Sequence, residues 1–329
     1  MRLSVLDQSP IAEGSTGGQA LHNSLELARL ADKLGYHRFW MAEHHATPSL
    51  ASASPEILLA LLARETRRIR IGTGGVMLPH YSPLKVAESF SMLSALFPGR
   101  IDLGLGRAPG SDPLTAFALQ QDRGQRAGHK FPEQVAELLG YFDDNLPADH
   151  PFRHLARTLA GGREQPEVWV LGSSLDSARL AGALGMPYCI ADFIAGEAPE
   201  LAEEYRRQFQ PSARSLQPQI IVCCWLVAAD SQQKAERLAA PSRMMFAQLS
   251  QGRLIAVPSP ETAIAWLADN PVRMPGNRQP IVGTVDFCRE ALQRRVKLYG
   301  ADEMMLVNIL HDHRDRMESY RLIAKAMLA

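Results

Sequence analysis

The chain has 329 residues, of which 46% are hydrophobic and 21% are charged, and its formal net charge is zero. This ordinary globular composition suffices for one large domain or two small ones, and its neutral balance argues against nucleic acid as a partner. No apolar run approaches the roughly 20 residues that span a membrane, so we expect no membrane contact.

The N-terminus and the cysteines favour a cytoplasmic protein. The first residues, MRLSVLD, are too short and too polar a run to be a signal sequence. The cysteines show neither CxxC nor zinc spacing, and we expect buried free thiols in a reducing compartment. They are Cys189, Cys223, Cys224 and Cys288. Cys223 and Cys224 are adjacent and should point to opposite faces of one strand.

Strands and helices alternate along the first part of the chain. Apolar segments of strand length begin near residues 3, 37, 69 and 101. Their spacing of about 32–34 residues is the length of one βα unit, and no hairpin signal separates them. The intervening helices have recognisable ends: the first closes at Gly35, the second follows Ser54 and Pro55, and the third follows Ser82.

The pattern continues, with two interruptions, to the end of the chain. Residues 111–167 hold helical pieces at 114–121 and 132–142 and a connector rich in proline and histidine. Residues 230–282 hold a helix and then a segment rich in proline and glycine. Outside these two segments the periodicity predicts strands at 168–171, 188–194, 220–227 and 304–309, and helices at 174–184, 284–298 and from about 314.

Eight strands that alternate with helices predict an α/β fold, a (β/α)8 TIM barrel with insertions after strands 4 and 7. We expect one domain over residues 1–329. The competing fold is a doubly wound open sheet. Its dinucleotide fingerprint, GxGxxG after the first strand, is absent between Asp7 and Gln19.

The second strand ends abruptly in titratable residues. Residues 39–45 read FWMAEHH, so Glu43, His44 and His45 follow an apolar run directly. In barrels and α/β sheets this end of a strand lies at the ligand-binding mouth. A histidine there can transfer protons near neutral pH. Adjacent histidines splay apart and lack the usual metal-ligand spacing, so we expect no metal site.

Two further strand ends carry candidate binding residues. Gly172, Ser173, Ser174 and Ser177 open a helix after the fifth strand, which suits a phosphate, with Arg107 as the neutralising charge. A plain serine N-cap explains the same serines. The segment from Gly74 to Val76 ends the third strand, where adjacent glycines allow a bulge or the close approach of a flat ligand. An ordinary loop is the alternative there.

These segments together resemble the bacterial luciferase-like flavin-dependent monooxygenases. The matching text is AEHH at 42–45, IGTGGVMLP at 71–79 and FPGRIDLGLGR at 97–107, followed by the run at 172–177 and the helix start at Gly283 and Thr284. The likeness spans nearly the whole chain. The nearest branch is that of uncharacterised luciferase-like oxidoreductases.

The resemblance implies a barrel that binds reduced FMN at its C-terminal mouth, usually as a homodimer. It assigns phosphate binding to Arg107 and to the serines of the run that begins at Gly172, namely Ser173, Ser174 and Ser177. It places Gly74, Gly75 and Val76 behind the isoalloxazine, where relatives carry a non-prolyl cis peptide. It makes His44 the catalytic histidine, a base near flavin and substrate.

The sequence therefore predicts a flavin-dependent oxidoreductase, a monooxygenase that uses reduced FMN and O2 on a small organic substrate. No nicotinamide fingerprint is present, so a separate flavin reductase should supply the reduced FMN. The alternatives are an F420-dependent hydride-transfer enzyme, a non-catalytic flavin-storage protein and, more remotely, a zinc hydrolase. Nothing in either insertion identifies the substrate.

Overall fold

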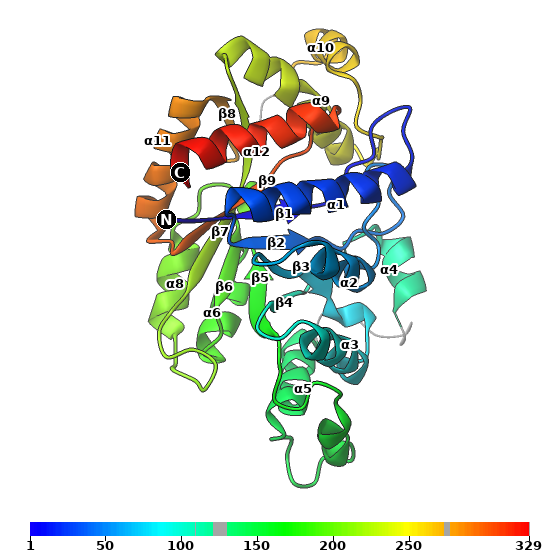
Figure 1. The fold of residues 1–329 in the computed structure, drawn as a ribbon, viewed down its shortest axis with the longest axis vertical. Coiled ribbons are helices and arrows are strands. Elements are labelled where there is room, and N and C mark those ends of the chain that lie inside the picture. Colours follow the sequence, from blue (N-terminus) through cyan, green and yellow to red (C-terminus); the bar gives the residue numbers. More distant parts are fainter. Residues whose placement is uncertain (109, 121–129, 273–276, 329) are drawn as a thin grey trace.

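The computed structural model describes residues 1–108, 110–120, 130–272 and 277–328. Eight of its strands close a parallel barrel in the order β1-β2-β3-β4-β5-β6-β7-β9, with β9 paired to β1 (Figure 1). The TIM-barrel prediction is confirmed. The strands are β1 (Arg2–Asp7), β2 (Arg38–Met41), β3 (Arg70–Met77), β4 (Ile101–Gly106), β5 (Glu167–Gly172), β6 (Tyr188–Ala191), β7 (Ile220–Ala229), β8 (Ile281–Thr284) and β9 (Glu303–Val307).

Helices surround the barrel, and many of their ends follow the local signals in the sequence. Gly35 ends α1 with a φ of 85°, and Thr284 caps α11 through its side chain. The α-helices are α1 (Gly17–Leu34), α2 (Pro55–Glu65), α3 (Pro83–Leu96), α4 (Pro113–Leu119), α5 (Phe131–Asp143), α6 (Leu175–Ala183), α7 (Asp192–Ala195), α8 (Glu200–Gln208), α9 (Gln232–Ser250), α10 (Pro260–Asp269), α11 (Val285–Tyr299) and α12 (His313–Met327). No described helix combines the length and apolar character that a membrane crossing needs.

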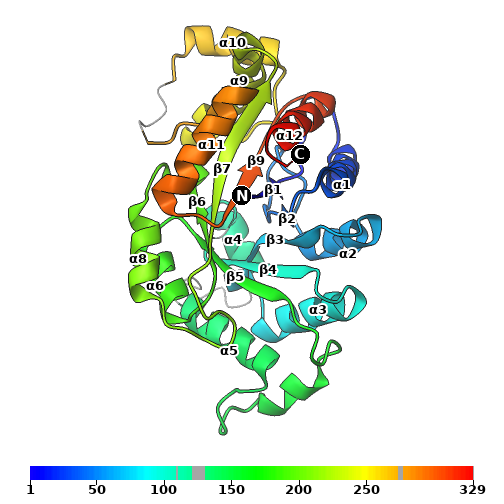
Figure 2. The ribbon, with the colours of Figure 1, turned by 60° about the vertical axis from the view of Figure 1, so that its left-hand side comes forward.

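The two insertions extend in opposite directions from the barrel. The first contributes α4, α5 and a 3-10 helix, η3 (Arg153–Thr158), and the second contributes α9 and α10. Helix α5 lies at one end of the molecule and α9 and α10 lie at the other (Figure 1, Figure 2). The expected helix at 114–121 is α4, and residue 121 falls outside the described residues.

Several elements differ from the expectation, among them the helix α10, which lies where a segment rich in proline and glycine was expected. The strand expected at 188–194 ends at Ala191, because the chain turns into α7 at the buried Asp192. The helix α8 carried no clear signal. The segment at 230–282 ends in an extra strand, β8, which pairs with the outer half of β7 beyond its barrel pairing with β9. That pairing prolongs the wall of the barrel above its mouth.

Side chains inside the barrel form a core separate from the layer under the helices. Trp40 and Trp169 meet edge to face with ring centroids 5.7 Å apart. Their indole N–H groups donate to Asp102 at 2.9 Å and to Glu167 at 3.0 Å. The predicted split of the adjacent cysteines is confirmed, since Cys223 lies inside the barrel and Cys224 lies in the outer layer. All four cysteines are buried free thiols.

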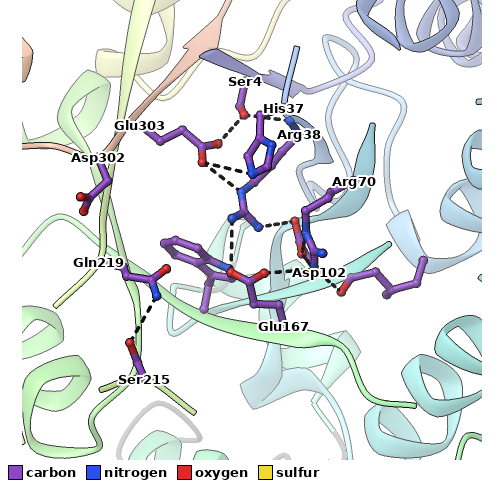
Figure 3. Close-up of polar contacts among 12 residues, drawn as sticks. Ser4, His37, Arg38, Arg70, Asp102, Glu167, Ser215, Gln219, Asp302 and Glu303 are labelled. Carbon is purple, nitrogen blue, oxygen red and sulfur yellow. Dashed lines mark hydrogen bonds and ion pairs between the residues drawn. The ribbon is translucent and has the colours of Figure 1, made fainter. Parts of the chain in front are cut away.

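A buried ion network closes the N-terminal end of the barrel (Figure 3). The Arg38 guanidinium lies 2.8 Å from Asp102, 3.1 Å from Glu303 and 3.2 Å from Glu167. Arg38, Asp102 and Glu303 are almost completely shielded from solvent. Burial alone would lower the pKa of Arg38, but the three carboxylates raise it well above its usual range. The ion network therefore closes the barrel interior at this end, beneath a polar surface pocket of about 520 Å³ that Arg38, Arg70 and Glu167 line.

Candidate active site

A cavity of about 210 Å³ opens at the C-terminal end of the barrel. We call it the mouth cavity. It brings together every residue that the sequence assigned to cofactor binding except Val76, although these residues come from three different strand ends. Its walls include Gly74, Gly75, Arg107, Gly172, Ser173, Ser174 and Ser177. The predicted residues therefore form one site.

Two glycines form the β3 side of the mouth cavity. The register of β3 against β4 shifts between Thr73 and Val76, so the expected irregularity is present, and the Gly74–Gly75 peptide is cis. A Cβ atom on Gly74 would come within 2.5 Å of the Leu6 side chain. A Cβ atom on Gly75 would come within 2.6 Å of a backbone oxygen of β4. Only residues without a side chain can pack this closely against Leu6 and β4.

The β5 side of the mouth cavity is polar. Ser174 caps α6, because its Oγ accepts from the Ser177 N–H at 3.4 Å, and the Ser177 Oγ in turn accepts from the Ser174 N–H at 3.3 Å. The N-cap interpretation is thus correct, and the same serines also line the cavity. Arg107 is half exposed and lies 4.0 Å from Asp176. A helix start, hydroxyls and a guanidinium together suit the phosphate end of a ligand.

The floor of the mouth cavity is apolar. It is made by Leu6, Trp40, Leu171, Cys189, Cys223 and Met305, all from the interior of the barrel. Burial raises the pKa of the Cys189 and Cys223 thiols, so both stay neutral. The cavity therefore offers a flat apolar region at one end and anion-binding groups at the other.

Glu43 links the ends of β2 and β3 beside this cavity. Its side chain is fully buried. One carboxylate oxygen accepts from the Tyr81 hydroxyl at 2.8 Å and lies 2.7 Å from the His45 Nε2, and the other accepts from the Met77 N–H at 3.0 Å. The sequence places Glu43 at a strand end but does not reveal this role, because Met77 and Tyr81 lie more than thirty residues away. Glu43 positions the strand end that carries the two glycines.

His44 lies at the end of β2 but is not among the residues that line the mouth cavity. Its backbone N–H donates to the Ser52 carbonyl at 2.8 Å. Its ring Nδ1 is buried and makes no hydrogen bond to any described residue. Burial lowers its pKa from 6.5 to about 4, although Glu43 opposes the shift. The imidazole is therefore neutral at pH 7. The Val76 side chain packs away from the cavity, in the layer under the helices.

Comparisons with known proteins identify the family. The family described as luciferase-like monooxygenase matches residues 1–302. This chain belongs to that family. The luciferase-like monooxygenase of Escherichia coli (strain K12) is 41% identical over 326 residues, which cover 97% of this chain and 95% of the relative. The N-acetyl-S-alkylcysteine monooxygenase of Bacillus subtilis (strain 168) is 37% identical over 333 residues, covering 100% and 99%.

Solved structures of luciferase-like proteins share the fold. The structure of apo-MsnO8 superimposes with a TM-score of 0.89 at 38% identity and covers 99% of this chain and 98% of its own. The oxygenating constituent of 3,6-diketocamphane monooxygenase from a Pseudomonas putida plasmid, in complex with FMN, has a TM-score of 0.70 at 20% identity, covering 99% and 97%. An F420-dependent secondary alcohol dehydrogenase reaches 0.63 at 15%, covering 98% of each chain. The last two likenesses concern the fold alone.

Among the residues that the structure describes, no three His, Cys, Asp or Glu side chains are arranged to hold a metal ion. The histidines at the mouth instead contact one another and their neighbours, with the His45 and His80 rings meeting edge to face at 5.8 Å.

The lowered pKa values of His37 and His44 predict that the free energy of unfolding depends on pH. The pKa of His37 is lowered to about 4 by burial and by the charges of Arg38 and Arg2, and that of His44 is also about 4. The unfolded chain binds protons near pH 6.5, whereas the folded chain binds them only near pH 4. The free energy of unfolding should therefore fall as the pH decreases from about 6.5 to about 4, by at most roughly 3 kcal/mol for His44.

Urea unfolding of the wild type and of His44→Asn at pH 7.5 and pH 4.5 measures this effect. Between pH 7.5 and pH 4.5 the free energy of unfolding should fall less in the variant than in the wild type. The variant lacks the His44 imidazole, which the unfolded chain protonates more readily than the folded one. Equal losses in the two proteins would show that His44 is not held neutral by the fold.

Proposed function

We propose that this protein is an FMN-dependent monooxygenase that takes reduced FMN from a separate flavin reductase and uses O2 to oxygenate a small organic substrate. The observation that carries the proposal is the mouth cavity, which is apolar and flat at one end and cationic and hydroxyl-rich at the other. The membership of the luciferase-like family and the named activities of its relatives support the same conclusion.

The residues present fit FMN. Gly74 and Gly75 present bare backbone to the cavity, where a ring could approach it. Trp40 and Met305 provide an apolar floor for an isoalloxazine. The start of α6 and Arg107 would hold the phosphate. When bound, reduced FMN supplies the electrons that reduce O2 and transfer one oxygen atom to the substrate.

The charges around the mouth cavity favour FMN over F420. F420 carries a longer and more acidic tail, which requires several cations. Among the described residues that line the cavity, Arg107 is the one arginine and there is no lysine. Its neighbour Asp176, 4.0 Å away, reduces the local positive charge further. This balance suits a single phosphate group.

His44 would accept or donate a proton in this reaction. Because its pKa is about 4, the ring is neutral at pH 7 and can exchange a proton at Nδ1, the atom that makes no hydrogen bond to any described residue. Its neighbour His45 is held by Glu43, so the backbone on both sides of His44 is anchored. The proposed role is proton transfer at the end of β2, beside the mouth of the barrel.

An anaerobic titration with reduced FMN, followed by admission of oxygen in a stopped-flow spectrometer, tests the proposed function. We expect binding, and then reoxidation that is slower than that of free reduced FMN and leaves a transient absorbance band. Tight binding with immediate reoxidation would favour storage. An absence of FMN binding would contradict the proposal and make F420 the next cofactor to titrate.

Replacing Arg107 by glutamine should weaken binding of FMN about tenfold, because one charged hydrogen bond to the phosphate is lost. Riboflavin has no phosphate, so its affinity should not change. Fluorescence titration with both flavins measures the difference. Arg321→Gln, which removes an exposed arginine of α12 that pairs with Glu318, is the control. An equal loss of affinity for FMN and for riboflavin would show that Arg107 does not bind the phosphate.

We also propose that a second copy of the chain covers an exposed apolar surface on α2 and α3. Four large side chains there are at least half exposed, in i, i+4 pairs on neighbouring helices: Ile57, Leu61, Met92 and Leu96. Solvent exposure of such a patch is unfavourable, and a homodimer would bury it.

A charge introduced into the exposed apolar surface on α2 and α3 tests whether this surface forms the homodimer interface. Leu61→Glu should convert the dimer to monomer, because a buried interface does not tolerate an unpaired carboxylate. Size-exclusion chromatography with light scattering measures the mass. Leu216→Glu, at an exposed loop leucine elsewhere, should leave the dimer intact. A monomeric wild type would refute this proposal without affecting the flavin site.

A further inference from the structure

Tyr188 lies behind the polar side of the mouth cavity. It is the first residue of β6, pairs with Val170 of β5 and is fully buried in the layer under the helices. Helix α6 packs against both of these strands (Figure 2). Tyr188 is not among the described residues that line the cavity, but its hydroxyl lies 2.9 Å from the Oγ of Ser177, which is one of them. Tyr188 therefore reaches the proposed phosphate site through Ser177.

The direction of this hydrogen bond follows from another partner of Ser177. The Ser177 Oγ lies 2.7 Å from the Ser174 carbonyl oxygen, which can only accept, so the Ser177 hydroxyl donates to it. Because a serine hydroxyl has a single proton, the Tyr188 hydroxyl must donate to Ser177. Burial raises the pKa of Tyr188, so the tyrosine keeps its proton. Tyr188 thus supplies the Ser177 oxygen with a permanent donor.

This donor holds the Ser177 hydroxyl in the first turn of α6. The Ser177 Oγ also accepts from the Ser174 N–H at 3.3 Å, a longer contact than the one to Tyr188. Gly172 makes room for the hydroxyl, since a Cβ atom on Gly172 would overlap the Ser177 side chain. Without the Tyr188 hydroxyl, a lone pair of the Ser177 oxygen would be left unpaired beside the cavity. An unpaired oxygen lone pair repels an anion, so the loss would disfavour a phosphate there.

We propose that Tyr188 is a positioning residue for the phosphate of the flavin, and that it acts by orienting the Ser177 hydroxyl at the start of α6. The identity of the ligand rests on the proposed function. Riboflavin has the same ring system as FMN but lacks the phosphate. Tyr188 should therefore contribute to the preference for FMN over riboflavin and leave the affinity for the ring system unchanged.

Tyr188→Phe tests the proposal, because it removes the hydroxyl and keeps the ring, which packs on the Tyr205 ring with centroids 5.4 Å apart. Fluorescence titration should show FMN bound about two- to tenfold more weakly than by the wild type, and riboflavin bound equally well. Tyr205→Phe is the matched control. Tyr205 is equally buried, and its hydroxyl donates to the Met186 carbonyl at 2.9 Å rather than to a residue of the cavity. Its replacement should change neither affinity.

A double variant separates an action through Ser177 from a general structural effect. Ser177→Ala alone should weaken FMN binding, and Tyr188→Phe should add nothing to that loss, because the hydroxyl that Tyr188 orients is already absent. Thermal unfolding verifies that each variant is folded.

Four results would overturn the proposal: additive losses in the double variant, an unchanged FMN affinity in Tyr188→Phe, an equal loss for FMN and riboflavin in that variant, or a wild type that binds FMN no more tightly than riboflavin. A preference for FMN that depends on Tyr188, without a transient absorbance band after oxygen is admitted, would retain the role of Tyr188 and reject the monooxygenase. A transient band in a protein whose FMN affinity is the same in Tyr188→Phe would do the reverse.

Discussion

Replacing Arg38 by methionine should lower the free energy of unfolding by about 3 to 5 kcal/mol. The side chain is 3% exposed and contacts Asp102, Glu303 and Glu167, of which the first two are themselves buried. Methionine fills the space but leaves these carboxylates without their shared cation. Burial already raises the pKa of Glu303 against the effect of Arg38, so removal of Arg38 would raise it further.

Urea unfolding at pH 8 and at pH 5 measures the cost of this change. The decrease in the free energy of unfolding should be smaller at pH 5. Carboxylates with raised pKa values become protonated there, and a neutral carboxyl group does not require a compensating cation. Arg29→Gln is the control, since Arg29 pairs with Glu65 on the surface, where an ion pair contributes about 0 to 1 kcal/mol. A loss below 1 kcal/mol in Arg38→Met would contradict this expectation and indicate that Arg70, which also pairs with Asp102 and Glu167, compensates these two carboxylates.

Replacing His44 by alanine should reduce turnover by about 10²- to 10⁴-fold, the usual contribution of a positioned proton-transfer group. Binding of reduced FMN should remain, because His44 does not line the mouth cavity. The ring makes no hydrogen bond to any described residue, so its removal breaks no polar contact of the fold. Steady-state oxygenation with a reductase and an accepted substrate measures the loss.

His22→Ala is the matched control, since His22 is exposed on α1. Its turnover should equal that of the wild type. If His44→Ala retained full turnover and full FMN affinity, proton transfer would have to be assigned elsewhere. A parallel loss of FMN affinity and turnover would instead indicate a cofactor-positioning role for His44.

Much of the barrel was predictable because its signals are local. A strand period, a helix period and a capping residue each act within a few residues, so the ends at Gly35 and Thr284 were predicted and confirmed. The strand expected at 188–194 ends at Ala191 in the structure, and the reason lies in contacts with distant residues. Asp192 turns into α7 where Arg295 and Tyr299, about a hundred residues later, neutralise and bind it.

The candidate site was predictable to the level of strand ends. Because parallel strands direct their carboxyl ends to one side, Gly74, Arg107 and Ser174 could be expected to meet, and they line one cavity. The orientation of individual side chains could not be read in this way. Val76 packs away from the cavity, and Glu43 proves to bind the end of β3 rather than only to flank a histidine.

The sequence alone determined the alternation of strands and helices, the positions of several helix ends and the residues that gather at the mouth. Tertiary structure decided which side chains face a cavity, which charges are compensated and where the second insertion builds a wall. Glu43 illustrates the difference, because its carboxylate accepts from the Tyr81 hydroxyl and the Met77 N–H, which lie more than thirty residues away. Packing between distant segments, which no local pattern encodes, sets these outcomes.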